Sequence, residues 1–200
     1  MTDSLPAVAL GADEKESDVM SKKPRDSKES LFAHGGIPMM MGYGLLITIG
    51  TLAAFFIAPY ISMTSLKYPF EISSFADYMA YFTGTIQVES LSENYFIQIA
   101  QTSAFCVLSI SELFHMLGMT SIRKSVVHNF KTKNKLLWLS FLAGIALQVG
   151  VVLIPGINTF FKCSGGLSWQ HWLMIFGLSF LPVVVHEIVA LILWLKNKKK

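Results

Sequence analysis

Four long stretches without an acidic or basic side chain constrain this chain more than any other feature. They cover residues 33–66, 94–122, 136–161 and 163–186, and the one exception inside them is Glu112. A helix that crosses a bilayer needs roughly 20 apolar residues, so each stretch is long enough for one crossing. Because 52% of all residues are hydrophobic and only 14% are charged, the sequence predicts an all-α polytopic membrane protein.

The composition also excludes several other classes of protein. An intrinsically disordered chain has fewer apolar residues, and a nucleic-acid binder has a stronger basic excess than the net charge of +3 found here. Cys106 lies in one apolar stretch and Cys163 follows a different one, so no disulfide is expected between them. The expected surroundings are therefore the lipid bilayer, with no nucleic acid as a partner.

The basic residues predict how the chain is oriented in the membrane. All of them except Lys67 and Lys162 fall in residues 13–29, in residues 123–135 or in the tail from Lys196 onward. Short segments rich in lysine and arginine stay on the cytoplasmic side. The sequence thus predicts a multi-pass protein of the cell membrane with both termini in the cytoplasm. The expected crossings are about residues 35–60, 95–119, 136–157 and 172–195.

Smaller features add three expectations. The outer segment between the first two crossings is long, and its residues 76–82 indicate a short interfacial helix. Gly42, Gly44 and Gly50 lie on one crossing, which is typical of close helix packing. His186 and Glu187 are interpreted as a structural pair near the cytoplasmic interface.

The first residues of the chain combine an acid with a helix-breaking proline. Asp3 stands three positions before Pro6 at the head of an apolar run. A proline leaves one backbone carbonyl without its helical donor, and broken helices of this kind supply oxygen ligands for cations inside membranes. The alternative from the residues alone is a plain helix cap, since Asp is common at the N-cap and Pro in the first turn.

Glu112 is the second candidate, because a carboxylate in the middle of a crossing is costly unless it is paired, hydrated or neutralised. Polar residues recur with it at helical spacing and form one stripe, which comprises Gln98, Thr102, Ser109, Glu112 and His115. The chemistry favours a cation ligand. The alternative is a protonated structural acid that is hydrogen-bonded to a neighbouring helix.

Two motifs together resemble a known family. The run T-D-S-L-P-A-V-A-L-G at residues 2–11 is followed by an acidic patch and then by D-V-M-S-K-K-P-R-D-S-K-E at residues 18–29. This order resembles the end of the sixth membrane helix and the next cytoplasmic loop of type II P-type cation pumps, most closely the bacterial calcium-transporting ATPases. The runs S-I-S-E-L-F-H at residues 109–115 and L-P-V-V-V-H-E-I at residues 181–188 are similar to the eighth and tenth helices of these pumps.

The resemblance implies both a domain plan and a set of ligands. Residues 1–12 would be the end of the sixth helix, residues 13–32 a cytoplasmic loop, and residues 33–200 the seventh to tenth membrane helices. By the same resemblance, Asp3, Thr2 and Glu112 would be metal ligands, and the transported cation would be calcium. A carboxylate, a hydroxyl and freed carbonyls suit an ion that takes six to eight oxygens.

The family's phosphorylation motif D-K-T-G-T and its T-G-E motif are absent from these 200 residues. The resemblance therefore implies no catalytic residue and no cofactor in this fragment, with ATP and magnesium bound only by the intact pump. The partner would be the N-terminal remainder of that pump. Two other hypotheses remain open on the sequence: a free-standing small membrane protein that regulates or assembles with a partner pump, and a complete small transporter.

Overall fold

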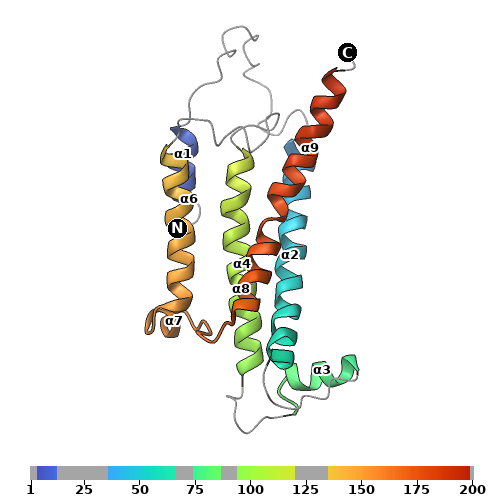
Figure 1. The fold of residues 1–200 in the computed structure, drawn as a ribbon, viewed down its shortest axis with the longest axis vertical. Helices are drawn as coiled ribbons and strands as arrows, with labels where there is room; N and C mark the ends of the chain where they lie inside the picture. Colours follow the sequence, from blue (N-terminus) through green and yellow to red (C-terminus); the bar gives the residue numbers. More distant parts are fainter. Residues whose placement is uncertain (1–3, 13–35, 66–73, 87–93, 120–134, 199–200) are drawn as a thin grey trace.

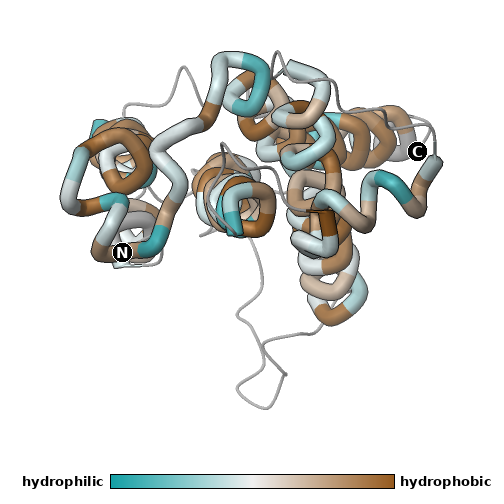
Figure 2. Tube along the Cα trace, turned by 90° about the horizontal axis from the view of Figure 1, so that it is seen from below, coloured by the Kyte–Doolittle hydropathy of each residue, from teal (hydrophilic) through white to brown (hydrophobic). Residues whose placement is uncertain are grey.

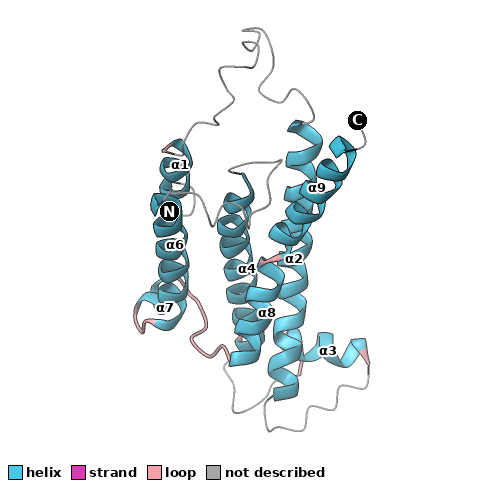
Figure 3. Cartoon of the chain, turned by 45° about the horizontal axis from the view of Figure 1, so that its top comes forward, coloured by secondary structure: helices cyan, strands magenta, loops and turns pink. Residues whose placement is uncertain are grey.

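The computed structural model describes residues 4–12, 36–65, 74–86, 94–119 and 135–198, and within these ranges every regular element is a helix. Four of the helical segments are long and apolar enough to cross a membrane, so the predicted all-α polytopic membrane fold is confirmed. Figures 1 and 3 show the helices in chain order: α1 (Ser4–Gly11), α2 (Gly36–Ser65), α3 (Phe75–Phe82), α4 (Tyr95–Met119), α6 (Lys135–Leu153), α7 (Ile157–Phe160), α8 (Trp169–Ser179) and α9 (Leu181–Lys198).

The observed helix ends differ in part from the ends expected from hydropathy, and one of them is set by a proline and a glycine. Helix α4 has the expected bounds, whereas α2 continues five residues beyond the expected end, to Ser65. Helix α6 stops at Leu153, before Pro155 and Gly156, and Gly156 has a φ of 89° that favours glycine. The chain then forms the single turn α7, so the third crossing is shorter than the expected range of residues 136–157.

The fourth crossing is two helices rather than one, which corrects the expectation of an uninterrupted span. Helix α8 ends at Ser179 and α9 begins at Leu181. Pro182 has no N–H to donate to the carbonyl of Leu178, so the regular helical ladder is broken at this point. Gly50 of α2 lies beside the break, where an added Cβ would be 3.9 Å from the Leu178 carbonyl oxygen.

Helix α4 is the central element of the bundle. Figure 2 shows it between α1 and α6 on one side and α2, α8 and α9 on the other. Helix α4 contributes to all three buried clusters of the described residues, and two of these clusters each join it to three other helices. The inner cluster joins Ala9 of α1 to α4, α6 and α9, and the middle cluster joins Ala54 of α2 to α4, α6 and α8. Some of these helices also pack directly on one another, namely α1 on α6 and α2 on α8 and α9.

Glycines permit the closest helix contacts, although two of the three predicted positions do not take part. Within the described residues no atom lies within 4 Å of a Cβ added at Gly42 or Gly44, so that expectation is wrong for them and holds only for Gly50. The tight approaches occur elsewhere. A Cβ added at Gly118 would lie 2.9 Å from Nδ1 of His186, and a Cβ added at Gly144 would lie 2.7 Å from a methyl group of Leu113.

Helix α3 lies across the C-terminal end of α2 and begins one residue before the short helix that the sequence predicted. Ser74 and Asp77 form a capping box that fixes its first turn. The Tyr78 hydroxyl donates to the backbone carbonyl of Phe56 at 2.8 Å, and its ring stacks on Phe82. Burial raises the pKa of this hydroxyl above its usual value. The short helix is thus tied to the C-terminal half of α2.

His171 joins α8 to α2 next to Pro59, the proline inside α2. Its Nδ1 accepts a hydrogen bond from the backbone N–H of Ser168 at 3.1 Å, which assigns the ring proton to Nε2. Nε2 lies 3.0 Å from both the carbonyl oxygen of Ala58 and the hydroxyl of Ser62. The side chain is only 2% exposed, so both ring nitrogens are satisfied by protein atoms.

We expect His171→Leu to lower the free energy of unfolding by about 1 to 3 kcal/mol, because the buried carbonyl of Ala58 and the buried hydroxyl of Ser62 lose a partner. Denaturation in mild detergent measures the change. Leu173→Ala on the same helix is the matched control, since Leu173 is 70% exposed and its truncation should have little effect. Equal losses for the two variants would contradict the structural role assigned to His171.

Candidate cation-binding site

Glu112 lies on α4, which is the most enclosed of the membrane helices. Its sequence neighbours Ser111 and Leu113 are 1% and 0% exposed, whereas Glu112 itself is only partly buried. Glu112 therefore points away from the packed interior of the bundle, although its helix is central.

The side of α4 that carries Glu112 is open along most of its length. Its exposed residues recur three, four or seven positions apart, which places them on one face of the helix. They are Gln98, Gln101, Phe105, Leu108 and Met119, with the partly buried Glu112 among them. We call this set the open face of α4. A face with a carboxylate at its centre is unsuited to contact with lipid.

The carboxylate of Glu112 has no hydrogen bond or salt bridge within the described ranges of the chain. No group of three or more metal-ligating side chains forms in those ranges either. Three buried hydroxyls of the described residues, those of Tyr43, Thr51 and Ser103, also have no hydrogen-bond partner. The structural alternative for Glu112, a hydrogen bond to a neighbouring helix, is thus not observed in the described part of the chain.

Two other residues of the predicted polar stripe are occupied by structural contacts. The Thr102 hydroxyl donates to the carbonyl of Gln98 at 2.7 Å and accepts from the backbone N–H of Ser164 at 2.8 Å. The ring of His115 packs against Tyr43 of α2, with the two ring centroids 4.4 Å apart. Glu112 is the acidic residue of α4, and it lies on the open face of that helix.

His186 and Glu187 occupy different surroundings. His186 is 2% exposed and packs against Gly118 of α4, so of the two structural roles expected for this pair, reaching toward the interface or contacting a neighbouring helix, His186 has the second. Glu187 is partly buried, and both residues take part in further interactions. The pair therefore remains a structural feature of the contact between α4 and α9.

Thr2 and Asp3 lie outside the described residues, and the structure places neither of them. It does describe the helix that starts directly after them. In α1, Ala9 is completely buried in the inner cluster, together with Met116 and Leu117 of α4 and Leu137 of α6. Figure 1 shows α1 and α4 running toward the same end of the bundle. The N-terminal end of α1 therefore lies nearer the middle of the bundle than its C-terminal end does.

Comparisons with known proteins agree on a single family. The family described as "Cation transporting ATPase, C-terminus" matches residues 1–192. Calcium-transporting ATPase 1 of Bacillus cereus is 35% identical over 193 residues, which cover 96% of this chain and 20% of that protein. A calcium-transporting ATPase of Bacillus subtilis is 29% identical over 182 residues, with 91% and 17% covered.

A plant relative matches over the same extent. The endoplasmic reticulum-type calcium-transporting ATPase 3 of Arabidopsis thaliana is 26% identical over 192 residues, covering 94% of this chain and 18% of the relative. The chain thus spans about a fifth of the length of the curated relatives that it matches.

Proposed function

Since the chain belongs to the family of cation-transporting ATPase C-termini, we propose that it forms the last membrane helices of an ATP-driven calcium pump and supplies oxygen ligands to the transported ion. The names of the relatives support calcium as the cargo. In the intact pump, ATP and magnesium would act on domains upstream of this chain, and the N-terminal remainder would be its partner.

The observation that carries the proposal is the position of Glu112. A carboxylate held inside a membrane without a partner is unfavourable by several kcal/mol. Its cost is offset when the open face of α4 meets a divalent cation whose other ligands come from outside the described helices. Calcium suits this role, because it takes six to eight oxygens from several elements.

Asp3 and Thr2 are proposed as ligands from a second helix. Pro6 has no N–H, so the carbonyl of Thr2, four residues earlier, loses its helical donor and is free to face a cation. The depth of α1 supports the pairing with Glu112. Ser4 precedes the buried Ala9 by about 7 Å along its helix, and Glu112 precedes Met116 of the same cluster by about 6 Å. Ser4, the first described residue of α1, is thus at about the level of Glu112 along the bundle, which supports the proposal that the two residues before Ser4 share a site with Glu112.

The orientation of the bundle is also part of the proposal. The ends of α2, α4, α6 and α9 that border the lysine-rich segments lie at one end of the bundle, opposite α3 and α7. We place this end in the cytoplasm on the basis of the positive-inside rule.

We expect a cysteine in place of Ser27 to be inaccessible to membrane-impermeant thiol reagents added outside intact cells, because residues 13–29 face the cytoplasm. Thr85→Cys, beside α3 at the opposite end, is the positive control and should be labelled. Both variants are made with Cys106 and Cys163 replaced by alanine. Labelling at Ser27→Cys but not at Thr85→Cys would invert the proposed orientation.

A chimeric pump tests the proposed function directly. In it this chain replaces the matching 193 residues of the Bacillus cereus calcium-transporting ATPase 1. Inside-out membrane vesicles that contain the chimera should accumulate calcium when ATP is added, whereas vesicles that contain the 200-residue chain alone should not. A chimera that inserts into the membrane at the level of the parent pump but drives no uptake would contradict the proposal.

A further inference from the structure

The break between α8 and α9 frees a backbone carbonyl inside a membrane-spanning segment. Figure 3 shows the break as a short loop between the two helices, beside α2. Pro182 cannot donate to the carbonyl of Leu178, and the N–H of Phe180 is shared between that carbonyl and the carbonyl of Phe176. A carbonyl oxygen has two lone pairs, so the Leu178 oxygen can accept a further hydrogen bond. Carbonyls freed in membrane helices are satisfied by neighbouring helices, hydroxyl side chains or ordered water.

Gly50 of α2 leaves room next to this carbonyl. A Cβ added at Gly50 would lie 3.9 Å from the Leu178 carbonyl oxygen and 4.0 Å from methyl groups of Val107 and Leu181. These are ordinary van der Waals distances, so a group as small as a methyl fits over Gly50 without moving the neighbouring helices. A water molecule is of similar size. Since Gly50 is buried, this space lies inside the bundle.

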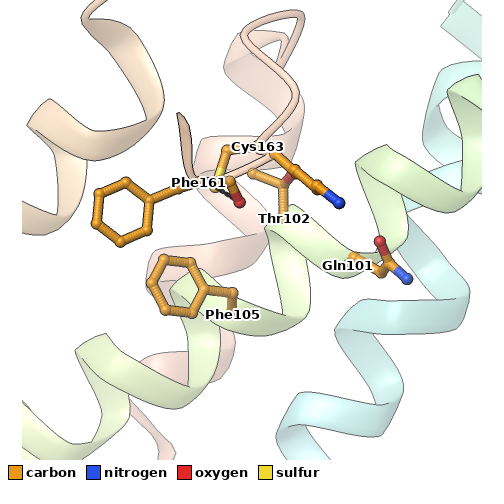
Figure 4. Close-up of a pocket in the computed structure, with 6 residues that line it drawn as sticks. Gln101, Thr102, Phe105, Phe161 and Cys163 are labelled. Carbon is orange, nitrogen blue, oxygen red and sulfur yellow. Dashed lines mark hydrogen bonds between the residues drawn. The ribbon is translucent and has the colours of Figure 1, made fainter. Parts of the chain in front are cut away.

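Thr51, the next residue of α2, directs its hydroxyl differently from the other described threonines of the membrane-spanning helices. The hydroxyls of Thr48, Thr64 and Thr102 each donate to the carbonyl four residues earlier, at 2.7 to 3.0 Å. Thr102 does so although it lines a pocket of about 260 Å³ (Figure 4). The Thr51 hydroxyl is buried and makes no such bond to its own helix, nor any other within the described residues.

We propose that the space between Gly50 and the α8–α9 break is a binding site for one water molecule, which donates to the Leu178 carbonyl and accepts from the Thr51 hydroxyl. The water supplies the hydrogen that Pro182 lacks and joins α2 to the middle of the fourth crossing. The site goes beyond the function proposed above. It lies against the buried Val107 and shares no residue with the open face of α4.

The chemistry of the lining favours water over an alkali cation. Within the described residues the site offers one carbonyl and one hydroxyl, while Val107 and Leu181 contribute methyl groups and no side chain of the site is charged. Two neutral oxygens cannot replace the hydration shell of a cation. A buried water needs about two to four polar partners, which this site can approach.

Gly50→Ala tests the site by filling it. The added methyl displaces the water and leaves the Leu178 carbonyl and the Thr51 hydroxyl without a partner. In the full chain in mild detergent, we expect the equilibrium constant for unfolding to rise about tenfold relative to the control variant. The control is Gly42→Ala on the same helix, because no atom of the described residues lies within 4 Å of its added Cβ. If Gly50→Ala is as stable as Gly42→Ala or more stable, the methyl displaced nothing and the proposal is overturned.

Thr51→Val tests the second hydrogen bond, because the substitution removes the hydroxyl and keeps the shape. We expect the unfolding constant to rise about fivefold, whereas the removal of a buried hydroxyl that has no partner would leave it unchanged or lower it. The control is Thr48→Val, since Thr48 makes the same change at an exposed position of α2. Gly50→Ala combined with Thr51→Val should raise the constant by less than the product of the two single effects, because both remove one water. Effects that multiply in full would contradict a shared ligand.

Two further measurements identify the occupant. Replacing sodium and potassium by choline should leave the unfolding constant unchanged, and a rise would assign the site to a cation and overturn the proposal. An electron cryomicroscopy map of the chimeric pump that resolves ordered water should show density about 3 Å from both the Leu178 carbonyl oxygen and Oγ1 of Thr51. A map that resolves waters elsewhere in the membrane domain but none here would also overturn it.

Discussion

Asp3→Asn in the chimeric pump is expected to abolish calcium transport while the protein is expressed and inserted normally. The substitution keeps the size of the side chain but removes the negative charge that compensates a dehydrated divalent cation, and a neutral amide oxygen cannot offset that cost. Phosphorylation by ATP should then no longer respond to calcium. The measurement is a calcium titration of phosphoenzyme and of vesicle uptake.

Asp26→Asn is the matched control, because it makes the same change of charge in the segment between α1 and α2, which we propose to be cytoplasmic. It should leave both titrations unchanged. If Asp3→Asn also kept the calcium affinity of the unmodified chimera, Asp3 would be a plain helix cap, and the ligand role would be lost at this residue.

Glu112→Gln should weaken apparent calcium affinity about 5- to 150-fold without eliminating transport. The amide keeps one oxygen on the open face of α4 but loses the charge, and ligands from the other helices remain. Calcium titrations of uptake measure the change in affinity.

The control for this variant is Glu187→Gln, since Glu187 is a partly buried acid on a different helix, α9, where it takes part in other interactions. It should change affinity little. A calcium affinity that is the same in Glu112→Gln and in the unmodified chimera would make Glu112 a structural acid.

The crossings could be predicted because they depend on apolar length alone. Helix α4 has the expected bounds, and all four membrane-spanning segments are where the uncharged stretches lie. The break at Phe180 was missed because hydropathy does not register that Pro182 lacks a donor. The chain contained this signal, but a search for apolar length gives it no weight.

Contacts between distant segments could not be predicted in the same way. Gly118 and Gly144 permit close packing because His186 and Leu113 happen to face them, and no local pattern encodes that pairing. Likewise, Thr102 was grouped with the polar stripe from its spacing, whereas its hydroxyl is occupied by Ser164, which lies 62 residues away. Glu112 could be singled out from the sequence because an acid inside an apolar helix is costly wherever it points.

Chemical labelling of Glu112 tests the central claim most directly. Hydrophobic carbodiimides modify carboxyl groups inside membranes, and peptide mass spectrometry of the unmodified chimera can quantify the modification at Glu112 and at Glu187 separately. The proposal predicts that calcium, but not magnesium, protects Glu112 and leaves the labelling of Glu187 unchanged. Equal modification of Glu112 with and without calcium, in a chimera that transports calcium, would contradict it.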